Sequence, residues 1–139
     1  MNREILFKAK RKDNGKWVEG YYLNVAKINH FICTGKIKLD GAVKGIIAPE
    51  MYAINATTLC QYTGLTDKNG KKIWENDICE MVYDGVVNTY VIVWDKDELD
   101  FKGTNGKEDY GGNFEYLGCC EEIITLGNIF DNPELLEVK

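Results

Sequence analysis

The side chains that could perform chemistry are few in this sequence, and their types limit the reactions that one chain could catalyse. There is no serine, only one histidine, His30, and only two arginines, Arg3 and Arg11. A serine nucleophile, a multi-histidine metal site and a cluster of bidentate arginine phosphate clamps are therefore excluded. The remaining carboxylate, thiol, lysine and tyrosine groups form no catalytic pattern. We expect a protein that is not an enzyme and has no catalytic residues, no cofactor and no metal.

An acidic stretch near residue 95 comes nearest to a metal-binding motif. It contains Asp95, Asp97, Glu98 and Asp100. An EF-hand calcium loop needs glycine at its sixth position and glutamate at its twelfth. Counted from Asp95, those positions hold Asp100 and Gly106, so the match fails. The stretch is interpreted as part of a solvated loop.

Cysteine is the other candidate for chemistry, with five residues and no C-x-x-C spacing. An odd number of thiols without that spacing is typical of reduced cysteines in a cytosolic protein. The adjacent pair Cys119 and Cys120 could be redox-active. On an alternating strand, by contrast, one of the two would point inward and the other outward. The sequence does not decide between these interpretations.

A basic segment near the N-terminus, accompanied by aromatic residues, is the strongest candidate for a binding surface. Cations on a strand beside aromatic rings can hold single-stranded nucleic acid. Lysines on an edge strand can equally serve to discourage sheet-to-sheet aggregation. The candidate contact surface consists of Lys8, Lys10, Arg11, Lys12, Lys16, Trp17 and Tyr21.

Charge is distributed unevenly along the chain. Residues 1–44 contain 10 Lys and Arg against 4 Asp and Glu, whereas residues 45–139 contain 7 against 18. The net charge is −5, and the pI of about 4.9 is low for a nucleic-acid-binding protein. Complementary basic and acidic patches, together with many Tyr and Trp side chains, favour a homo-oligomer. The same asymmetry could instead reflect two solvated faces that neutralise each other.

The elements that would position these side chains are mainly β-strands. Four turn dipeptides, each with glycine after Asn or Asp, separate apolar runs and predict antiparallel hairpins. The strongest strand patterns cover residues 89–94 and 123–126, which are rich in β-branched and aromatic side chains. The turn dipeptides are Asn14-Gly15, Asn69-Gly70, Asp84-Gly85 and Asn105-Gly106.

Helical signals are short by comparison. Residues 49–53, which begin with Pro49, could open a short helix, and residues 132–136 could form a terminal turn capped by Asn132. Residues 96–112 are rich in charge and glycine and predict a long, mobile hairpin or loop. The expected fold class is therefore mainly β, with antiparallel meanders and only short helical turns.

Three segments resemble the sequence signature of the YopX family, whose members are small phage and prophage proteins of Gram-positive and other bacteria. They are residues 61–78 (QYTGLTDKNGKKIWENDI), residues 127–136 (GNIFDNPELL) and residues 3–9 (REILFKA). The resemblance implies a β-rich fold with an SH3-like small barrel, no catalytic residues, and a biochemical role that is not established.

The signature is interpreted as structural. Gly64 and Gly70 are predicted to serve turns and Asp67 to cap its own loop. Ile73, Trp74 and Ile78 are predicted to be core residues. The signature residues are Tyr62, Gly64, Asp67, Gly70, Ile73, Trp74, Asp77, Gly127, Asn128 and Pro133.

Two places depart from the family pattern. Asn76 stands where the family usually has glycine, and Asn is the residue most able to replace a glycine at positive φ. We therefore expect Asn76 in or near the left-handed region. Lys10 and Arg11 stand where the family often has Trp and Asp, so a contact surface shared by relatives is expected to differ in this chain.

These observations predict a single YopX-like domain over residues 1–139, with a possible subdivision into a basic β region, 1–57, and an SH3-like barrel region, 58–139. We expect a non-enzymatic phage or prophage accessory protein that binds a phage or host macromolecule in the host cytoplasm. The alternative is a module that binds single-stranded nucleic acid weakly through the basic N-terminal hairpin. No run of about 18 apolar residues occurs and the first eight residues become charged early, so neither a membrane span nor export is expected.

Overall fold

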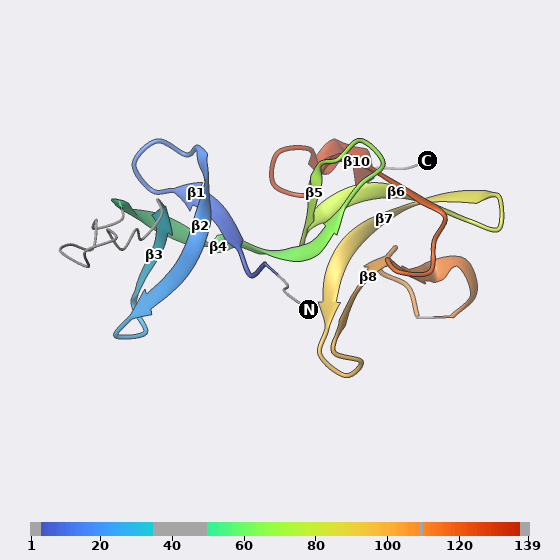
Figure 1. Ribbon diagram of the computed structural model, residues 1–139, viewed down its shortest axis with the longest axis horizontal. Coiled ribbons are helices and arrows are strands. Elements are labelled where there is room, and N and C mark those ends of the chain that lie inside the picture. Colours follow the sequence, from blue (N-terminus) through green and yellow to red (C-terminus); the bar gives the residue numbers. More distant parts are fainter. Residues whose placement is uncertain (1–3, 35–49, 109, 137–139) are drawn as a thin grey trace, which may run out of the picture. The chain divides into compact units, whose positions relative to one another are not determined.

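The computed structural model describes residues 4–34, 50–108 and 110–136. Contacts between residues divide the chain into two compact units, Met1–Gln61 (unit 1) and Tyr62–Lys139 (unit 2). The described residues form two five-stranded antiparallel sheets and two short 3-10 turns (Figure 1). The prediction of a mainly β chain with only short helical turns is confirmed. The division between the units falls within one long strand, β4 (Glu50–Thr66).

The strands of unit 1 pair in a ring. β1 (Phe7–Arg11) pairs with β2 (Trp17–Val25), β2 pairs with β3 (Asn29–Thr34), and β3 pairs with β4. β4 also pairs with β1, and the register shifts there between Lys8 and Lys10. Such an irregularity bends the strands locally. The pairing of β4 with β1 closes the ring of strands.

The core of unit 1 lies on one face of these strands. Ala9, Ile32 and Ile54 are fully buried and come from β1, β3 and β4. Directly opposite residues of antiparallel strands share a face, and successive residues alternate between faces. Because Ala9 and Ile32 point into the core, Lys8, Lys10 and the residues opposite them on β2 lie on the outer face. Half-buried residues that pack against the core are Phe7, Val18, Tyr22 and Leu59.

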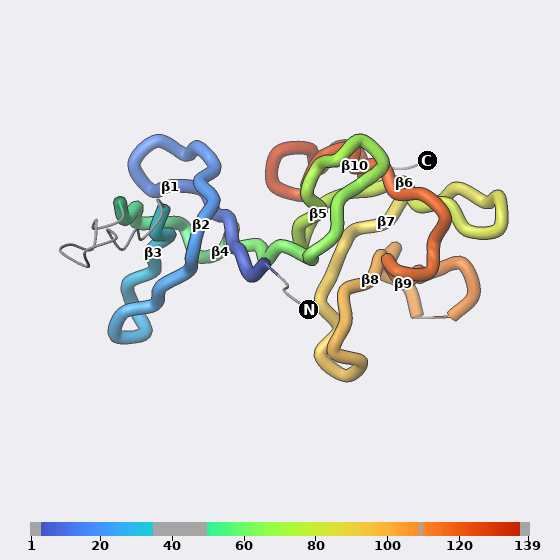
Figure 2. Tube along the Cα trace, in the orientation of Figure 1, coloured from blue at the N-terminus to red at the C-terminus, as the bar shows by residue number. Residues whose placement is uncertain are grey.

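Unit 2 contains a meandering sheet in the order β10-β6-β7-β8-β9, and its path can be followed in Figure 2. β5, which precedes this sheet in sequence, pairs with the end of β4. The strands are β5 (Lys72–Trp74), β6 (Asp77–Tyr83), β7 (Val86–Asp95), β8 (Asp100–Thr104), β9 (Phe114–Tyr116) and β10 (Glu122–Asn128), and the 3-10 turns are η1 (Gly111–Asn113) and η2 (Pro133–Leu136).

The core of unit 2 lies on one face of this sheet. Its members come from β5, β6, β7, β8 and β10, together with Leu117 from the turn after β9. The prediction that Ile73, Trp74 and Ile78 are core residues is confirmed, since each is at most 4% exposed. The buried cluster is Ile73, Cys79, Met81, Tyr90, Ile92, Phe101, Leu117 and Ile123.

The predicted hairpin turns are confirmed. Asp84 and Gly85 join β6 to β7 with φ of +51° and +77°, the left-handed values that a two-residue antiparallel hairpin needs. The second residue of the other three dipeptides also has positive φ. The strongest strand patterns, 89–94 and 123–126, lie within β7 and β10.

Two predictions about local structure are wrong. Glu50–Ala53 belong to β4 rather than to a helix, because they pair with Phe31–Thr34 of β3, and this pairing outweighs a weak local helix signal. Pro49 itself lies outside the described residues. Residues 96–112, predicted as a long hairpin or loop, contain a strand, β8, in which Phe101 and Gly103 are buried against β7, so the loop alternative is wrong and the hairpin alternative agrees with the β7–β8 pair.

The two remaining local predictions have mixed outcomes. The terminal turn at residues 133–136 is confirmed as η2. The backbone carbonyl of Asn132 accepts from Leu135 N–H, but its side-chain oxygen accepts from Asn128 N–H at 3.2 Å. Cys119 and Cys120 lie in the turn between β9 and β10 and not on an alternating strand.

Candidate functional site

The basic N-terminal hairpin brings three of the predicted contact residues together on its outer face. Lys10 lies directly opposite Trp17 in the β1–β2 register, and Lys8 lies two residues along the same face. The ammonium of Lys8 lies 4.5 Å from the centroid of the Trp17 ring, and that of Lys10 lies 5.4 Å away. Both distances are within the range of a cation–π interaction, so the indole holds two cations in place. We call Lys8, Lys10 and Trp17 the lysine–tryptophan cluster.

Arg11 does not join this cluster. It lies opposite the buried Ile54, so its side chain points to the other face of the sheet, over the ring of Tyr52 at 4.1 Å. Its guanidinium also forms an ion pair with Asp13, in which Nε donates to Oδ1 at 2.9 Å. The positive charge of Arg11 is therefore largely compensated by Asp13 within the same hairpin.

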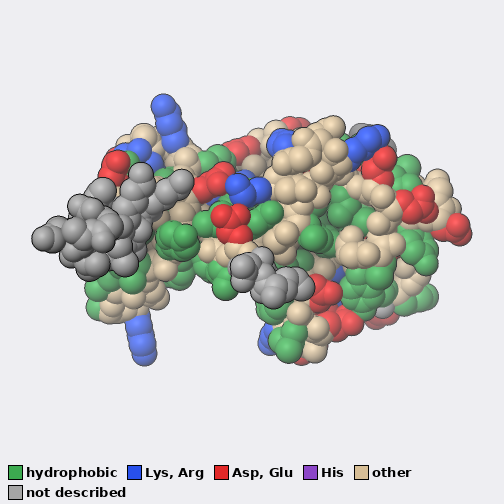
Figure 3. All heavy atoms as spheres, in the orientation of Figure 1, with side chains coloured by type: hydrophobic (Ala, Val, Ile, Leu, Met, Phe, Trp, Pro, Cys, Tyr) green, Lys and Arg blue, Asp and Glu red, His purple; other side chains and the backbone are tan. Residues whose placement is uncertain are grey.

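The other predicted contact residues flank the cluster. Lys12 and Lys16 are exposed in and beside the β1–β2 turn, where Lys16 N–H donates to the side chain of Asn14. Tyr21 lies on the same outer face as Trp17, four residues along β2, and is 59% exposed. Figure 3 shows Lys and Arg side chains projecting from unit 1 and several Asp and Glu side chains on the surface of unit 2.

Charge counts over the two units agree with this view. Unit 1 has 10 Lys and Arg against 5 Asp and Glu, whereas unit 2 has 7 against 17. The two contact-defined units therefore have formal net charges of +5 and −10. Counted along the sequence, the net charge changes from positive to negative near residue 44. Counted by unit, the change falls within β4, at the boundary between the two units.

The signature residues build the connection between β4, β5 and β6. The rings of Tyr62 and Trp74 lie opposite each other in the β4–β5 pair with centroids 5.4 Å apart, and both are buried. Asp77, which is 3% exposed, accepts a hydrogen bond from Trp74 N–H at 2.8 Å and so closes the turn before β6. Gly70 lies in a turn with a φ of +81°, as predicted, whereas Gly64, also predicted to serve a turn, lies within β4 with a φ of +92°, where the β4–β5 register shifts. These contacts give Tyr62, Trp74 and Asp77 a structural role in this connection.

Asp67 ties the signature loop to a distant strand. Its Oδ1 accepts hydrogen bonds from the N–H groups of Asn69 and Lys71, both at 2.9 Å, and its Oδ2 accepts from Thr125 N–H in β10 at 3.0 Å. Burial raises the pKa of Asp67, but these three backbone donors outweigh it and hold the pKa below its usual range. The predicted role of Asp67 as a cap of its own loop is confirmed, and the bond to β10 adds to it.

The residues of the C-terminal signature hold together the turn that follows β10 and the segment that leads into η2. Asn128 accepts from the N–H groups of Phe130 and Asp131 through its side-chain oxygen, both at 2.9 Å. A Cβ at Gly127 would lie 2.3 Å from the side-chain oxygen of Asn132, so glycine permits this close approach. Pro133 begins η2. All of these residues support the fold at the end of β10.

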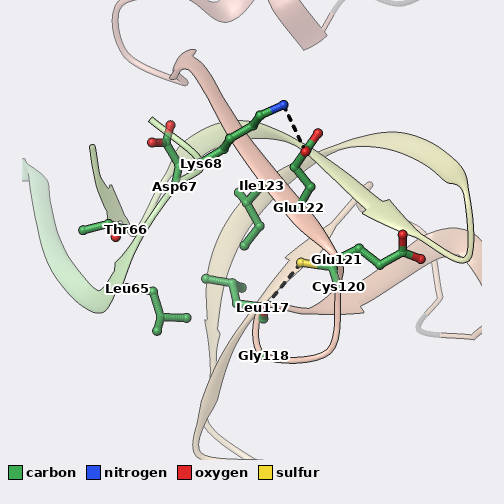
Figure 4. A pocket seen from close by; sticks show the side chains of 10 residues that line it. All are labelled: Leu65, Thr66, Asp67, Lys68, Leu117, Gly118, Cys120, Glu121, Glu122 and Ile123. Atoms are coloured by element: carbon green, nitrogen blue, oxygen red, sulfur yellow. Dashed lines mark hydrogen bonds and ion pairs between the residues drawn. The ribbon is translucent and has the colours of Figure 1, made fainter. Parts of the chain in front are cut away.

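A cavity of about 390 Å³ lies beside the signature loop, between the end of β4 and the segment that leads into β10 (Figure 4). Leu65, Leu117 and Ile123 provide its apolar wall, and an ion pair between Lys68 and Glu122, 3.1 Å long, lies at its rim. Among the described residues, no buried side-chain nitrogen or oxygen lacks a hydrogen-bond partner. The cavity therefore offers an apolar wall and, among the described residues, no buried polar side chain without a hydrogen-bond partner.

The surroundings of Cys79 and Cys120 do not activate their thiols. Cys120 lines the cavity and donates to Leu117 C=O at 3.3 Å, while Cys119 is exposed. Burial raises the pKa of Cys120, and it raises that of Cys79 to about 12, so neither thiol ionises readily near neutral pH. No group of His, Cys, Asp and Glu side chains suited to a metal ion is found within residues 4–34, 50–108 and 110–136. The same residues contain no helix long and apolar enough to span a membrane.

Two features of the structure were not predicted from the sequence. Lys102 is buried and donates to Asp95 at 2.6 Å, in an ion pair between β8 and β7. No sequence signal marks this lysine, because its burial depends on the pairing of β8 with β7 and β9. The second feature is an apolar outer edge on β2, which could have been noticed because no charged residue occurs between Glu19 and Lys27.

Comparisons with known proteins give one family and one similar fold. The family model described as YopX protein matches residues 6–137. No curated protein matches the chain. Among solved structures, the crystal structure of protein EF1440 from Enterococcus faecalis is similar, with a TM-score of 0.50 and 20% sequence identity over 97% of this chain and 99% of that one. At this identity the likeness concerns the fold alone.

Proposed function

Because this chain belongs to the YopX family, we propose that it is a non-enzymatic accessory protein of a phage or prophage that binds a partner protein in the host cytoplasm. The proposed binding surface is the lysine–tryptophan cluster with Lys12, Lys16 and Tyr21 around it. The partner would present acidic side chains beside an apolar or aromatic patch. The observation that carries this proposal is the pair of ammonium groups held over the Trp17 ring on an outer sheet face.

A protein partner is favoured over single-stranded nucleic acid for three physical reasons. Base stacking needs an open aromatic face, and the face of Trp17 already has the Lys8 ammonium 4.5 Å from its centroid. Arg11, the only arginine among the candidate contact residues, is paired with Asp13. The net charge of −5 also opposes the approach of a polyanion. Fixed ammonium groups remain well suited to carboxylates on a protein surface.

The test compares capture of cellular proteins by three forms of the chain. They are the wild type, the double variant Lys8→Glu/Lys10→Glu, and the control Lys71→Glu/Lys107→Glu, which changes two exposed lysines of unit 2 by the same charge. We expect the wild type and the control to retain a host or phage protein that the Lys8/Lys10 variant loses. Treatment with nuclease should not release it. Equal capture by all three forms, or release by nuclease, would contradict the proposal.

We further propose that unit 2 is an SH3-like small barrel. The support is a set of hydrogen bonds that join the loop after β4 to the edge strand β10. Lys68 N–H donates to Ile123 C=O at 2.9 Å, beside the bond from Thr125 N–H to Asp67. Closure of this kind should protect the Lys68 and Thr125 amides from hydrogen exchange as strongly as the amides of β6 and β7. Rapid exchange at both positions would indicate an open sheet.

We also propose that the protein forms a homo-oligomer. The units of opposite net charge can orient an encounter between copies, and exposed apolar side chains on the strands can stabilise the complex. Orientation by charge predicts faster association at low salt, while buried apolar area predicts that the oligomer persists at moderate salt. Sedimentation equilibrium at micromolar concentration tests this: a monomer near 15.8 kDa at both salt concentrations would contradict it.

A further inference from the structure

We propose that two copies of this chain join through the outer edge of β2, with residues 21–25 of each copy pairing as antiparallel strands around a two-fold axis at Leu23. This inference rests on the proposed self-association and names the strand that mediates it. The lysine–tryptophan cluster itself lies on the part of β2 that β1 already covers, and Tyr21 is the one residue of the proposed binding surface that also belongs to this edge.

The first observation is an open strand edge. β1 begins at Phe7, whose partner is Gly20, so β1 covers β2 only from Trp17 to Gly20. From Tyr21 to Val25, β2 pairs with β3 along its other edge. Within the described residues, no strand pairs with this stretch on the side of β1. An edge of this kind presents unpaired N–H and C=O groups and can receive another strand.

The second observation is the chemistry of this edge. No charged residue occurs between Glu19 and Lys27, in a chain of which 28% is charged. Tyr21, Leu23 and Val25 lie on the outer face and are 59%, 41% and 43% exposed. Figure 3 shows hydrophobic side chains gathered at the end of unit 1 where Figure 1 places the β2–β3 hairpin.

Soluble proteins usually protect a free edge with charged residues, a proline or a bulge, because an uncharged apolar edge invites pairing with another chain. The stretch from residue 21 to residue 25 has none of these protections. An edge that is covered by a second copy does not need them. The absence of charge is thus accounted for if this edge is an interface.

The third observation selects a second copy and a register. A two-fold axis at Leu23 places each Leu23 opposite its counterpart and each Tyr21 opposite Val25 of the other copy. The same register brings Glu19 of one copy toward Lys27 of the other, at both ends of the pair. Opposite charges at the ends of an uncharged stretch make the edge complementary to itself. A shift of the axis by one residue, to Tyr22, would instead bring Lys27 toward Trp17.

The test uses the residue on the two-fold axis, because it meets itself. Leu23→Glu and Leu23→Lys should each raise the dissociation constant of the dimer at least tenfold, since two like charges would face each other at the centre. Mixing the two variants should restore the dimer, because Glu and Lys would then be opposed. Sedimentation equilibrium at micromolar concentration measures all three samples, and circular dichroism checks that each variant is folded. Val86→Glu and Val86→Lys are the controls, since Val86 is an apolar residue of β7 with a similar exposure of 57%.

A second set of variants tests the register without placing charge on the strand pair. Glu19→Lys and Lys27→Glu should each weaken the dimer, and the double variant should recover it. If Leu23 variants fail to fold, this set alone decides the register.

The outcomes separate this inference from the proposals on which it rests. A wild-type monomer at both low and moderate salt would overturn the dimer and leave the capture experiment with Lys8 and Lys10 unaffected. A wild-type dimer that persists in both Leu23 variants would overturn the assignment to β2 alone. Dissociation of each variant without recovery on mixing would overturn the two-fold register at Leu23.

Discussion

The carboxylate of Asp67 accepts a hydrogen bond from the backbone N–H of Thr125, 58 residues further along the chain, at a distance of 3.0 Å. The same carboxylate holds its own loop through Asn69 and Lys71. One side chain thus fixes the β4–β5 loop and joins it to β10. The loop is the centre of the family signature, and these hydrogen bonds account for the acidic residue at this position.

Replacement of Asp67 by Asn should destabilise the protein by about 2 kcal/mol, because one of the two carboxylate oxygens that accept backbone N–H groups is lost. Urea unfolding of the wild type and Asp67→Asn measures the difference. Asp97→Asn, in the exposed β7–β8 turn, is the control and should change stability little. An unchanged midpoint for Asp67→Asn would contradict the structural role of this carboxylate.

The same carboxylate predicts a loss of stability in acid. Since the pKa of Asp67 is lower in the folded protein than in the unfolded chain, its contribution is complete above the unfolded value, near pH 4, and disappears as the pH falls through the folded value. The wild type should therefore lose more stability than Asp67→Asn between about pH 5 and pH 2. Parallel curves of unfolding free energy against pH for the two proteins would show that the shift is absent.

Asn76 has a φ of +73°, as predicted from its place in the signature. Asn76→Gly should be neutral or slightly stabilising, because glycine adopts this conformation without steric cost. Asn76→Val should cost about 1 kcal/mol or more, because a β-branched residue resists positive φ. Thermal melting of the two variants tests this, and equal melting temperatures would rule out the conformational explanation.

Gly20 permits a close approach between β2 and β3. A Cβ at this position would lie 2.1 Å from the carbonyl oxygen of Cys33, so the backbone would have to move. Gly20→Ala should cost about 3 kcal/mol, at the upper end for overpacking. Gly118→Ala is the matched control, since a Cβ there meets nothing within 4 Å, and it should be neutral or slightly stabilising. Similar melting temperatures for both variants would contradict the contact.

The buried pair of Asp95 and Lys102 should respond unequally to loss of either partner. Asp95→Ala leaves the ammonium of Lys102 buried, with a side chain only 6% exposed, and should cost about 3 kcal/mol. Lys102→Met keeps most of the packing and leaves Asp95 with hydrogen bonds from the N–H groups of Asp97 and Glu98, so its cost should be smaller. Chemical denaturation of both variants decides this, and a larger cost for Lys102→Met would reverse the argument.

Nucleic-acid binding should be weak. With a net charge of −5 and Arg11 paired with Asp13, we expect no sequence-specific binding of duplex DNA, and any binding of single strands should disappear as salt is added. Fluorescence anisotropy with labelled duplex and single-stranded oligonucleotides at two salt concentrations measures this. Nanomolar affinity for a duplex near physiological salt would overturn the prediction.

Local chemistry in the sequence determined the strands, the turns and the signature loop. Asn-Gly and Asp-Gly pairs, runs of β-branched and aromatic residues, and an Asn where the family pattern usually has glycine are features of short segments, and neighbouring residues decide their energy. The turns at Gly15, Gly70, Gly85 and Gly106, and the left-handed conformation of Asn76, could for this reason be predicted before any long-range contact was known.

Long-range pairing decided what the sequence could not. The tertiary structure alone placed β8 inside a predicted loop, turned residues 50–53 into a strand, and buried Lys102 beside Asp95, because each depends on partners from other strands. The strand pairing also divided the residues of the candidate contact surface between the two faces of the sheet. Lys8 and Lys10 meet Trp17 on one face, while Arg11 points to the other face, since the β1–β4 pairing places it opposite the buried Ile54. A strand alternates its side chains between two faces, and only the pairing of the whole sheet determines which face is buried.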